Sequence, residues 1–302
     1  MSKMGKKIIL VIILSITLGG CFGGFPEVKK VGIIEGYVKD ILTNQTLGQV
    51  TIRVQDVTFV TDNDGYFPLV RDSETQPYII PKASGDGYSM KKDGYYGETG
   101  VSVFSYGQKN LIGYLTPKAS DKIYSINGVA RDNTGKILEG VTVIVNGVFS
   151  GESFKKVTDS NGVFVFDKIP GGNINIYAFK DGYTAYSTGR INLSSNKEVS
   201  VEIREDTTIK YGTIKGGISG FNKELCGHSL VVWGQEGSKE YQFTVADTNG
   251  KYTLYGIPEG KSQISVKSPG MYQPSPGSEN IVAVTAGAIT LHDVQMQYIK
   301  GE

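Results

Sequence analysis

Three acidic motifs are the first residues in the chain whose types and spacing suggest chemistry. They read "TDNDGYF" from Thr61, "TDSNGVF" from Thr158 and "ADTNGKY" from Ala246. Closely spaced Asp and Asn oxygens can begin a calcium-binding loop. An EF-hand loop starting at Asp62, however, would need an oxygen ligand at position 66, Gly at 67 and Glu at 73, where the chain has Tyr, Phe and Ser. The motifs therefore favour turns, in which Asp and Asn bond their own backbone and Gly adopts positive φ. We expect no metal site and no cofactor.

Other catalytic signatures are also missing from the sequence. The chain has only two histidines, His228 and His292, and they fall in different strand patterns. Neither belongs to an HExxH or HxxE motif, and no nucleophile–base pair can be assembled from the residue pattern. We therefore expect no catalytic residues and no enzyme activity.

The N-terminus carries a targeting signal. Three lysines precede the apolar run "IILVIILSITL", which is followed by "LGGC" ending at Cys21. A basic region, a short apolar region and small residues before a cleavage site are typical of a secretory signal. Residues 18–21 also resemble the lipobox of bacterial lipoproteins. That resemblance implies cleavage before Cys21 and lipidation of its thiol, so that two acyl chains anchor the protein stably to a membrane. An ordinary secreted protein is the alternative.

Charge argues against a nucleic-acid partner. The 302-residue chain has 31 Lys and Arg against 30 Asp and Glu. Removing residues 1–20 takes away three lysines and no acids, which leaves a net charge of −2. Without a basic field, binding to nucleic acid is not expected. Cys226 is the only cysteine besides Cys21, so we expect no disulfide to hold the fold together.

The rest of the chain predicts an all-β fold built from three copies of one unit. The acidic positions of the three motifs lie 97 and 88 residues apart, which suits separate small domains. Apolar and polar residues alternate in blocks such as Val50–Gln55 and Val199–Arg204. This period of two places one face of a strand on a core and the other in water.

The repeats resemble a known family. "INGVARD", "TGKILEGVTVIV" and "VTDSNGVFVFDKIPGG" in the second copy are similar to the carboxypeptidase regulatory-like domain. The third copy keeps Asp247, Gly250 and "IPEG", whereas the first copy has no equivalent of the "IPEG" sequence. The resemblance implies three tandem Greek-key β-sandwich domains without catalytic activity. We expect them at residues 31–117 (repeat 1), 122–206 (repeat 2) and 209–299 (repeat 3), after a signal peptide at 1–20 and a lipidated tether at 21–30.

Short polar linkers between the repeats suggest domains arranged like beads in a line. Two roles remain open: a structural spacer or interaction module on the bacterial cell envelope, or a carbohydrate-binding surface lipoprotein. Aligning His228 with Val141 turns Leu230 and Val232 inward and Trp233 outward. Together with three tyrosines in the Tyr- and Gly-rich stretch of repeat 1, this predicts candidate contacts for a cell-envelope glycan or protein: Tyr88, Tyr95, Tyr96 and Trp233. We expect the protein to be a monomer that is anchored to the outer membrane, or to the outer face of a single membrane.

Overall fold

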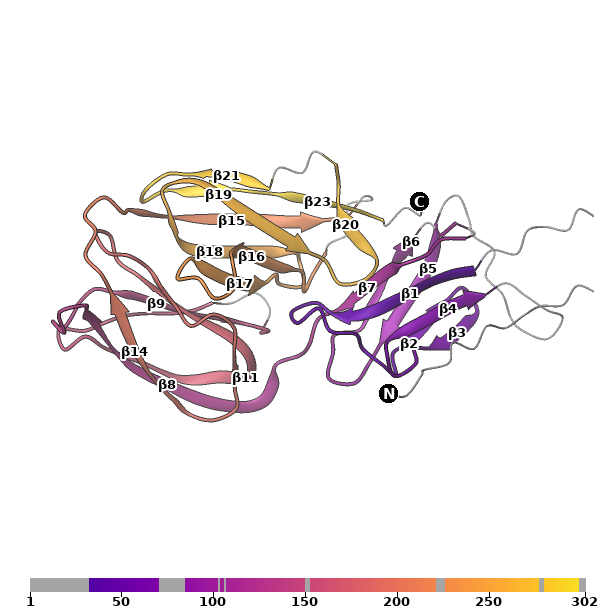
Figure 1. Cartoon of the computed structure of the whole chain (residues 1–302), viewed down its shortest axis with the longest axis horizontal. Coiled ribbons are helices and arrows are strands. Elements are labelled where there is room, and N and C mark those ends of the chain that lie inside the picture. The colour runs from indigo at the N-terminus through magenta and orange to yellow at the C-terminus, as the bar shows by residue number, and fades with distance from the viewer. Residues whose placement is uncertain are drawn as a thin grey trace, which may run out of the picture. The chain divides into compact units, whose positions relative to one another are not determined.

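The computed structural model describes residues 33–70, 85–102, 104–105, 107–149, 153–220, 226–276 and 280–298. They belong to one compact unit. All regular elements of the described residues are strands, so the predicted all-β fold is confirmed (Figure 1). None of the described segments is a helix with the length and hydropathy that crossing a membrane requires. The predicted lipidation site, Cys21, lies outside the described residues.

Repeat 1 consists of two sheets around a core. Its strands are β1 (Ile33–Asp40), β2 (Thr51–Val54), β3 (Val57–Val60), β4 (Tyr66–Val70), β5 (Asp86–Lys91), β6 (Glu98–Ser102) and β7 (Leu111–Leu115). One sheet has the order β4-β1-β7 and the other the order β3-β2-β5-β6. Alternating residues of both sheets meet in the core, among them Val38, Ile52, Phe67, Met90 and Leu115.

Repeat 2 has the same plan, with one long strand shared by both sheets. Its strands are β8 (Ser120–Asp132), β9 (Thr142–Gly147), β10 (Phe154–Val157), β11 (Val163–Phe179), β12 (Tyr186–Ser187), β13 (Ile191–Leu193) and β14 (Lys197–Ile203). The first half of β11 pairs with β8, and the second half pairs with β9. The register shifts near Ile169 and Pro170, within the "IPGG" sequence. Because proline cannot donate to the ladder, this is where the strand passes from one sheet to the other.

Repeat 3 contains β15 (Tyr211–Ser219), β16 (Leu230–Gly234), β17 (Tyr241–Val245), β18 (Lys251–Pro258), β19 (Gly260–Lys267), β20 (Tyr272–Pro274), β21 (Ile281–Val284), β22 (Ile289–Leu291) and β23 (Val294–Tyr298). One sheet has the order β18-β15-β23-β20, with β22 also on β15, and the other the order β17-β16-β19-β21. Here Glu259 separates the two strands that β11 joins in repeat 2.

All three repeats close with a parallel strand pair. β1 pairs with β7, β8 with β14, and β15 with β22 and β23. The other strand pairs are antiparallel, as is typical of strands with alternating apolar and polar residues. The first and last strands of a repeat are joined through the whole sandwich and not by a hairpin, and such a long connection allows them to run in parallel.

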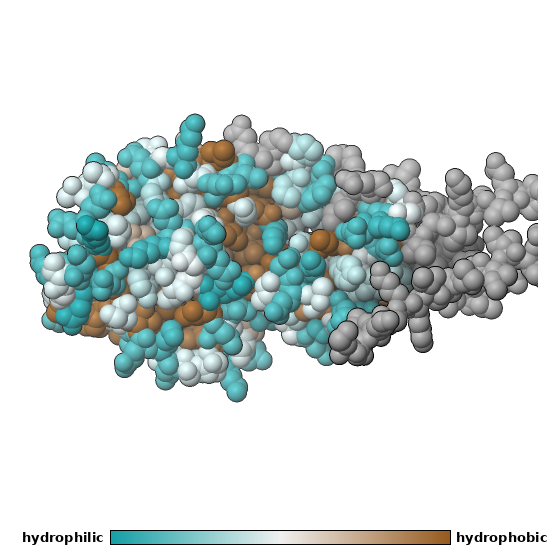
Figure 2. Space-filling view, in the orientation of Figure 1, coloured by the Kyte–Doolittle hydropathy of each residue, from teal (hydrophilic) through white to brown (hydrophobic). Residues whose placement is uncertain are grey.

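Polar residues cover most of the visible face of the molecule, with apolar patches between them (Figure 2). Several large apolar side chains on the strands remain exposed, including Ile123, Ile281 and Leu291. Scattered residues of this kind are normal on soluble proteins.

Candidate functional site

The three acidic motifs form the same hairpin turn. In the second copy, Asp159 Oδ1 accepts hydrogen bonds from the backbone N–H of Asn161 at 2.9 Å and of Val163 at 2.8 Å. Gly162 has φ of 71° and donates its N–H to the Asp159 carbonyl at 2.9 Å. Asp62 and Asp247 make the equivalent bonds. The turn prediction is confirmed, because one oxygen of each carboxylate is bonded to its own turn.

The His, Cys, Asp and Glu side chains of the described residues do not gather into a metal centre. Among the residues that the structure describes, no group of three or more His, Cys, Asp or Glu side chains is placed to hold a metal ion. His292 is buried, and its Nδ1 lies 2.6 Å from the Tyr252 hydroxyl, which also donates to the His292 carbonyl. Burial raises the pKa of Tyr252 above its usual range. This pair joins β18 to the segment between β22 and β23, within one sheet of repeat 3.

The most developed constellation of side chains lies where the repeats meet. Repeat 2 contributes a core residue to repeat 3: Tyr177 on β11 points away from its own core and is fully buried among the core residues of repeat 3. Its ring meets Trp233 edge-on, with 6.1 Å between centroids. Its hydroxyl donates to the Gly256 carbonyl at 2.9 Å. Burial raises the pKa of this hydroxyl far above its usual value, so it stays protonated as a donor.

Repeat 3 in turn contributes a core residue to repeat 1. Met271 is fully buried among the core residues of repeat 1. Its backbone N–H donates to the Tyr88 hydroxyl at 2.8 Å. Next to it, Gly270 and Tyr114 exchange two backbone hydrogen bonds of 2.7 and 2.9 Å, which add a short bridge to β7.

A separate apolar cluster joins all three repeats. Ile41 and Leu42 come from repeat 1, Val148 comes from repeat 2, and repeat 3 supplies Leu230, Tyr241 and Phe243. These side chains of β16 and β17 face outward from repeat 3, opposite its own core residues Val231 and Trp233. A sheet buried on both faces cannot be left alone in water without a loss of hydrophobic stabilisation.

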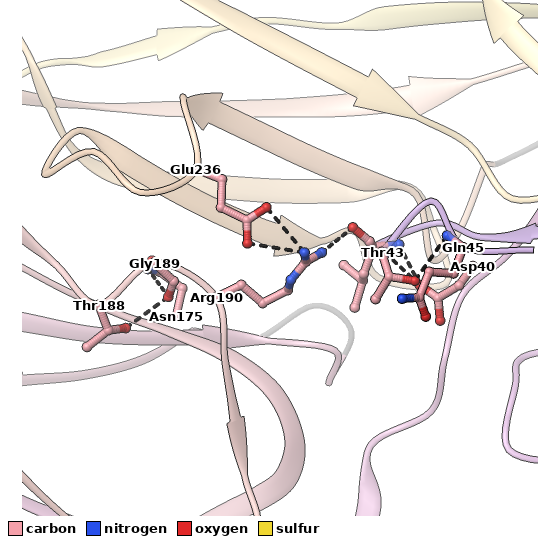
Figure 3. Close-up of polar contacts among 9 residues, drawn as sticks. Asp40, Thr43, Gln45, Asn175, Thr188, Gly189, Arg190 and Glu236 are labelled. Carbon is pink, nitrogen blue, oxygen red and sulfur yellow. Dashed lines mark hydrogen bonds and ion pairs between the residues drawn. The ribbon is translucent and has the colours of Figure 1, made fainter.

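Arg190 connects the three repeats by polar contacts (Figure 3). From repeat 2, its Nη2 lies 3.1 Å from the Glu236 carboxylate of repeat 3, and its Nη1 donates to the Leu42 carbonyl of repeat 1. Asp40 orders the turn that presents this carbonyl, since Asp40 Oδ1 accepts the N–H groups of Leu42 and Thr43 at 2.8 and 2.9 Å.

The residue before Arg190 is also held in place. Asn175 Nδ2 donates to the Gly189 carbonyl at 3.0 Å, and Thr188 Oγ1 donates to the same carbonyl at 2.9 Å (Figure 3). Arg190 therefore extends from a backbone segment that its own repeat has already ordered. A side chain that extends from an ordered segment can hold its partners, here Glu236 and the Leu42 carbonyl, in a fixed geometry.

Two of the four predicted contact residues are buried. Tyr88 is 4% exposed and lies in the core of repeat 1, and Trp233 is 5% exposed and lies in the core of repeat 3. The expectation that Trp233 faces solvent is therefore wrong. Tyr88 lies in strand β5, in which Asp86, Tyr88 and Met90 alternate inward.

The other two residues are partly buried. Tyr95 donates its hydroxyl to Asp40 Oδ2 at 3.0 Å, and burial is the main reason why its pKa is raised. Tyr96 of repeat 1 stacks on His228 of repeat 3, with 3.8 Å between ring centroids and 10° between planes. Thr116 Oγ1 donates to the His228 carbonyl at 2.8 Å in the same place. The structure thus assigns both tyrosines contacts inside the protein.

The error at Trp233 has a specific cause, which is an alignment shifted by one residue. His228 has φ of 56° and donates its N–H to Ala246 O, as Gly140, with φ of 74°, donates to Thr158 O. His228 is therefore equivalent to Gly140 and not to Val141. A shift by one residue moves every side chain of a strand to the opposite face, so Trp233 turns inward.

The comparisons with known proteins agree with the fold of repeat 2. Residues 125–205 match the sequence profile of the carboxypeptidase regulatory-like domain. Repeat 2 is similar to that domain. The resemblance inferred from its motifs is thereby confirmed for this part of the chain. No curated protein is similar enough to the chain to count as a match.

Several solved structures are distantly similar. The Bacillus anthracis TIE protein is 14% identical over 88% of this chain and 51% of its own, with a TM-score of 0.26, so this chain spans about half of its length. A minor pilin of Streptococcus agalactiae is 14% identical over 59% of this chain and 98% of its own, also with a TM-score of 0.26. A streptococcal ancillary pilin is 11% identical over 88% and 99%, at 0.24. Scores this low support no conclusion about function.

Sequence reasoning missed Tyr177, Met271 and Arg190, the residues that join the repeats. One signal was available in "INIYAF" (174–179), whose last four residues are all apolar or aromatic. A strand without polar residues on either face is typically buried on both faces. Met271 and Arg190 had no such signal, because each lies in a loop or strand edge whose partner is distant in the sequence.

Proposed function

We propose that this protein is a non-catalytic component of the bacterial cell envelope, anchored by lipid at Cys21, whose three β-sandwich repeats form one interlocked body. Such a body holds a surface at a fixed distance from the membrane. The observation that carries this proposal is the exchange of core residues: Tyr177 enters repeat 3, and Met271 enters repeat 1. A flexible chain of beads would not need these insertions.

The interlocked body predicts cooperative unfolding. In calorimetry of the full chain, we expect one dominant transition, because neither repeat 1 nor repeat 3 has a complete core without its neighbour. Three well-separated transitions would contradict the interlocked arrangement.

The membrane anchor needs its own test. We expect the wild-type protein to incorporate labelled palmitate, and Cys21→Ser to abolish this and to leave the protein as a precursor or in the soluble fraction. Cys226→Ser is the matched control and should retain the label. A wild-type protein without label would overturn the anchor but would leave the interlocked body intact.

A further inference from the structure

A cavity of about 540 Å³ opens at one end of repeat 3. Trp233 lines it together with Gln235, Glu240, Lys261, Ser262 and Gln263. Its size falls within the range of small-ligand sites, about 300–1,000 Å³. Trp233 is the only tryptophan of the chain.

Two buried polar side chains face this cavity without a partner. Trp233 is 5% exposed and Ser262 is 8% exposed. Among the described residues, none forms a hydrogen bond with the Trp233 indole N–H or with the Ser262 hydroxyl. Both residues line the cavity, and neither polar atom is fully enclosed in the described interior. Polar groups at this depth are normally bonded, so both are available to a ligand or to water.

The walls of the cavity are fixed by the backbone. On one side, the Gln235 carbonyl accepts the N–H and the hydroxyl of Ser238 at 3.1 and 2.8 Å. On the other side, Glu259 donates its N–H to Lys210 O at 2.9 Å, and its carboxylate accepts the N–H of Ala286 at 3.3 Å. A glycine is required at position 234, where φ is 76° and a Cβ would lie 1.5 Å from the Glu240 carbonyl oxygen.

The floor of the cavity is held from repeat 2. The Tyr177 ring meets Trp233 edge-on at 86° and keeps the indole in one orientation. Insertion of Tyr177 therefore does more than fill the core of repeat 3: it also positions the buried donor of the cavity. A site whose floor and walls are ordered in advance loses less entropy when it binds a ligand.

We infer that this cavity is a saccharide-binding site. The lining interleaves donors, namely the indole N–H, the Ser262 hydroxyl and the Lys261 ammonium, with acceptors on Glu240 and Gln263. A sugar hydroxyl both donates and accepts, so a polyhydroxylated ligand satisfies such a lining. With two carboxylates and one ammonium among its lining residues, Glu240, Glu259 and Lys261, the cavity has no strong positive field that would select an anion. This inference does not depend on the spacer role or on the membrane anchor.

The single tryptophan makes the test direct. The full-length chain, purified in a detergent without a sugar headgroup, is applied to an array of bacterial and plant glycans. The glycans that bind are then titrated as free oligosaccharides while the tryptophan emission is recorded. We expect a saturable change in emission with at least one of them. An array without any binding, or binding without a change in emission, would overturn the inference.

Variants locate the site. Gln263→Ala removes an exposed side chain and should weaken binding by at least roughly tenfold, as loss of a central polar contact does. Gln273→Ala, an exposed glutamine on β20 that does not line the cavity, is the matched control and should bind like wild type. Trp233→Phe keeps a core ring and removes the N–H donor. If Gln263→Ala and Trp233→Phe both bind on the array as strongly as the control Gln273→Ala, the glycan binds elsewhere and the inference is wrong.

Discussion

Repeat 1 and repeat 2 can be compared at one cross-strand pair, which lies on the outer face of the sheet that contains β2 and β5 in repeat 1 and β9 and β11 in repeat 2. In repeat 2 this pair is Ile144 and Tyr177; both side chains are fully buried, and Tyr177 lies among the core residues of repeat 3. The equivalent pair in repeat 1 is Arg53 and Ser89, where Arg53 is exposed and Ser89 is half-buried. The two strand pairs have the same register and matching inward residues. Outward residues therefore decide whether this face of the sheet is covered by a neighbouring repeat.

Repeat 3 supports the same conclusion. Its equivalent pair is Val232 and Ser265, with Val232 half-buried at the junction cluster and Ser265 exposed. Of the three equivalent positions, only that in repeat 2 carries an aromatic side chain that enters another core. One substitution at an outward position can thus convert a domain surface into an interface, since an aromatic ring buries a large apolar area.

The largest effect is expected at Tyr177. Tyr177→Ala should lower the free energy of unfolding by about 4 kcal/mol, because it leaves a cavity in repeat 3 and an unpaired Gly256 carbonyl. Urea unfolding of the full chain measures this. Ser89→Ala at the equivalent position of repeat 1 is the control and should change stability by less than about 0.5 kcal/mol. Equal effects of the two variants would remove the basis of the comparison.

Met271 tests the same idea at a second junction, where repeat 3 contributes a side chain to the core of repeat 1. Met271→Ala should lower the free energy of unfolding by about 3 kcal/mol, within the usual range for a buried methionine. Hydrogen exchange should accelerate in β5 and β7 of repeat 1, although the mutation lies in repeat 3. Acceleration restricted to repeat 3 would show that Met271 does not complete the core of repeat 1.

Arg190 should have a smaller effect, because its ion pair with Glu236 is partly exposed. Arg190→Met is expected to lower the free energy of unfolding by about 1 kcal/mol, mostly through the lost bond to the Leu42 carbonyl. A double-mutant cycle with Glu236→Gln separates the two contributions. If raising the salt concentration abolished the whole effect of Arg190→Met, the ion pair and not the carbonyl bond would be the main contact.

The smallest predicted effect is a dependence on pH at His228. Burial lowers the pKa of this imidazole below its ordinary value of 6.5, although Asp247 partly opposes the shift. The unfolded chain therefore binds the proton more readily, and stability should fall as the pH drops below about 6.5. The Tyr96 ring stacks on this imidazole, Asp247 acts on it through its charge, and Lys118 Nζ lies 5.7 Å from the Tyr96 ring centroid.

His228→Asn should flatten this part of the pH profile of unfolding, and asparagine tolerates the positive φ at this position. A profile between pH 5 and 7 that the substitution does not alter would show that the imidazole is not desolvated at the junction. The midpoint of urea unfolding at each pH provides the measurement.

Much of each repeat could be predicted from the sequence, because the deciding interactions are local. The Asp159–Gly162 turn satisfies its own backbone within five residues, so its residue types predict it wherever it occurs. Alternation predicted the inward side chains of β14 correctly, with Val199, Val201 and Ile203 buried. Trp233 was placed on the wrong face because the sequence alignment of repeats 2 and 3 was shifted by one residue. It matched His228 with Val141, whereas the backbone geometry matches His228 with Gly140.

What the sequence by itself determined was the strand pattern, the turns and the family resemblance of repeat 2, since each depends on neighbours along the chain or on a period of two. Only the tertiary structure decided which outer faces are covered. Tyr177 and Gly256 lie 79 residues apart, and Tyr88 and Met271 lie 183 apart. No local pattern specifies a partner at such separations, because the energy of the contact comes from surface that becomes buried only when complete repeats have formed and met.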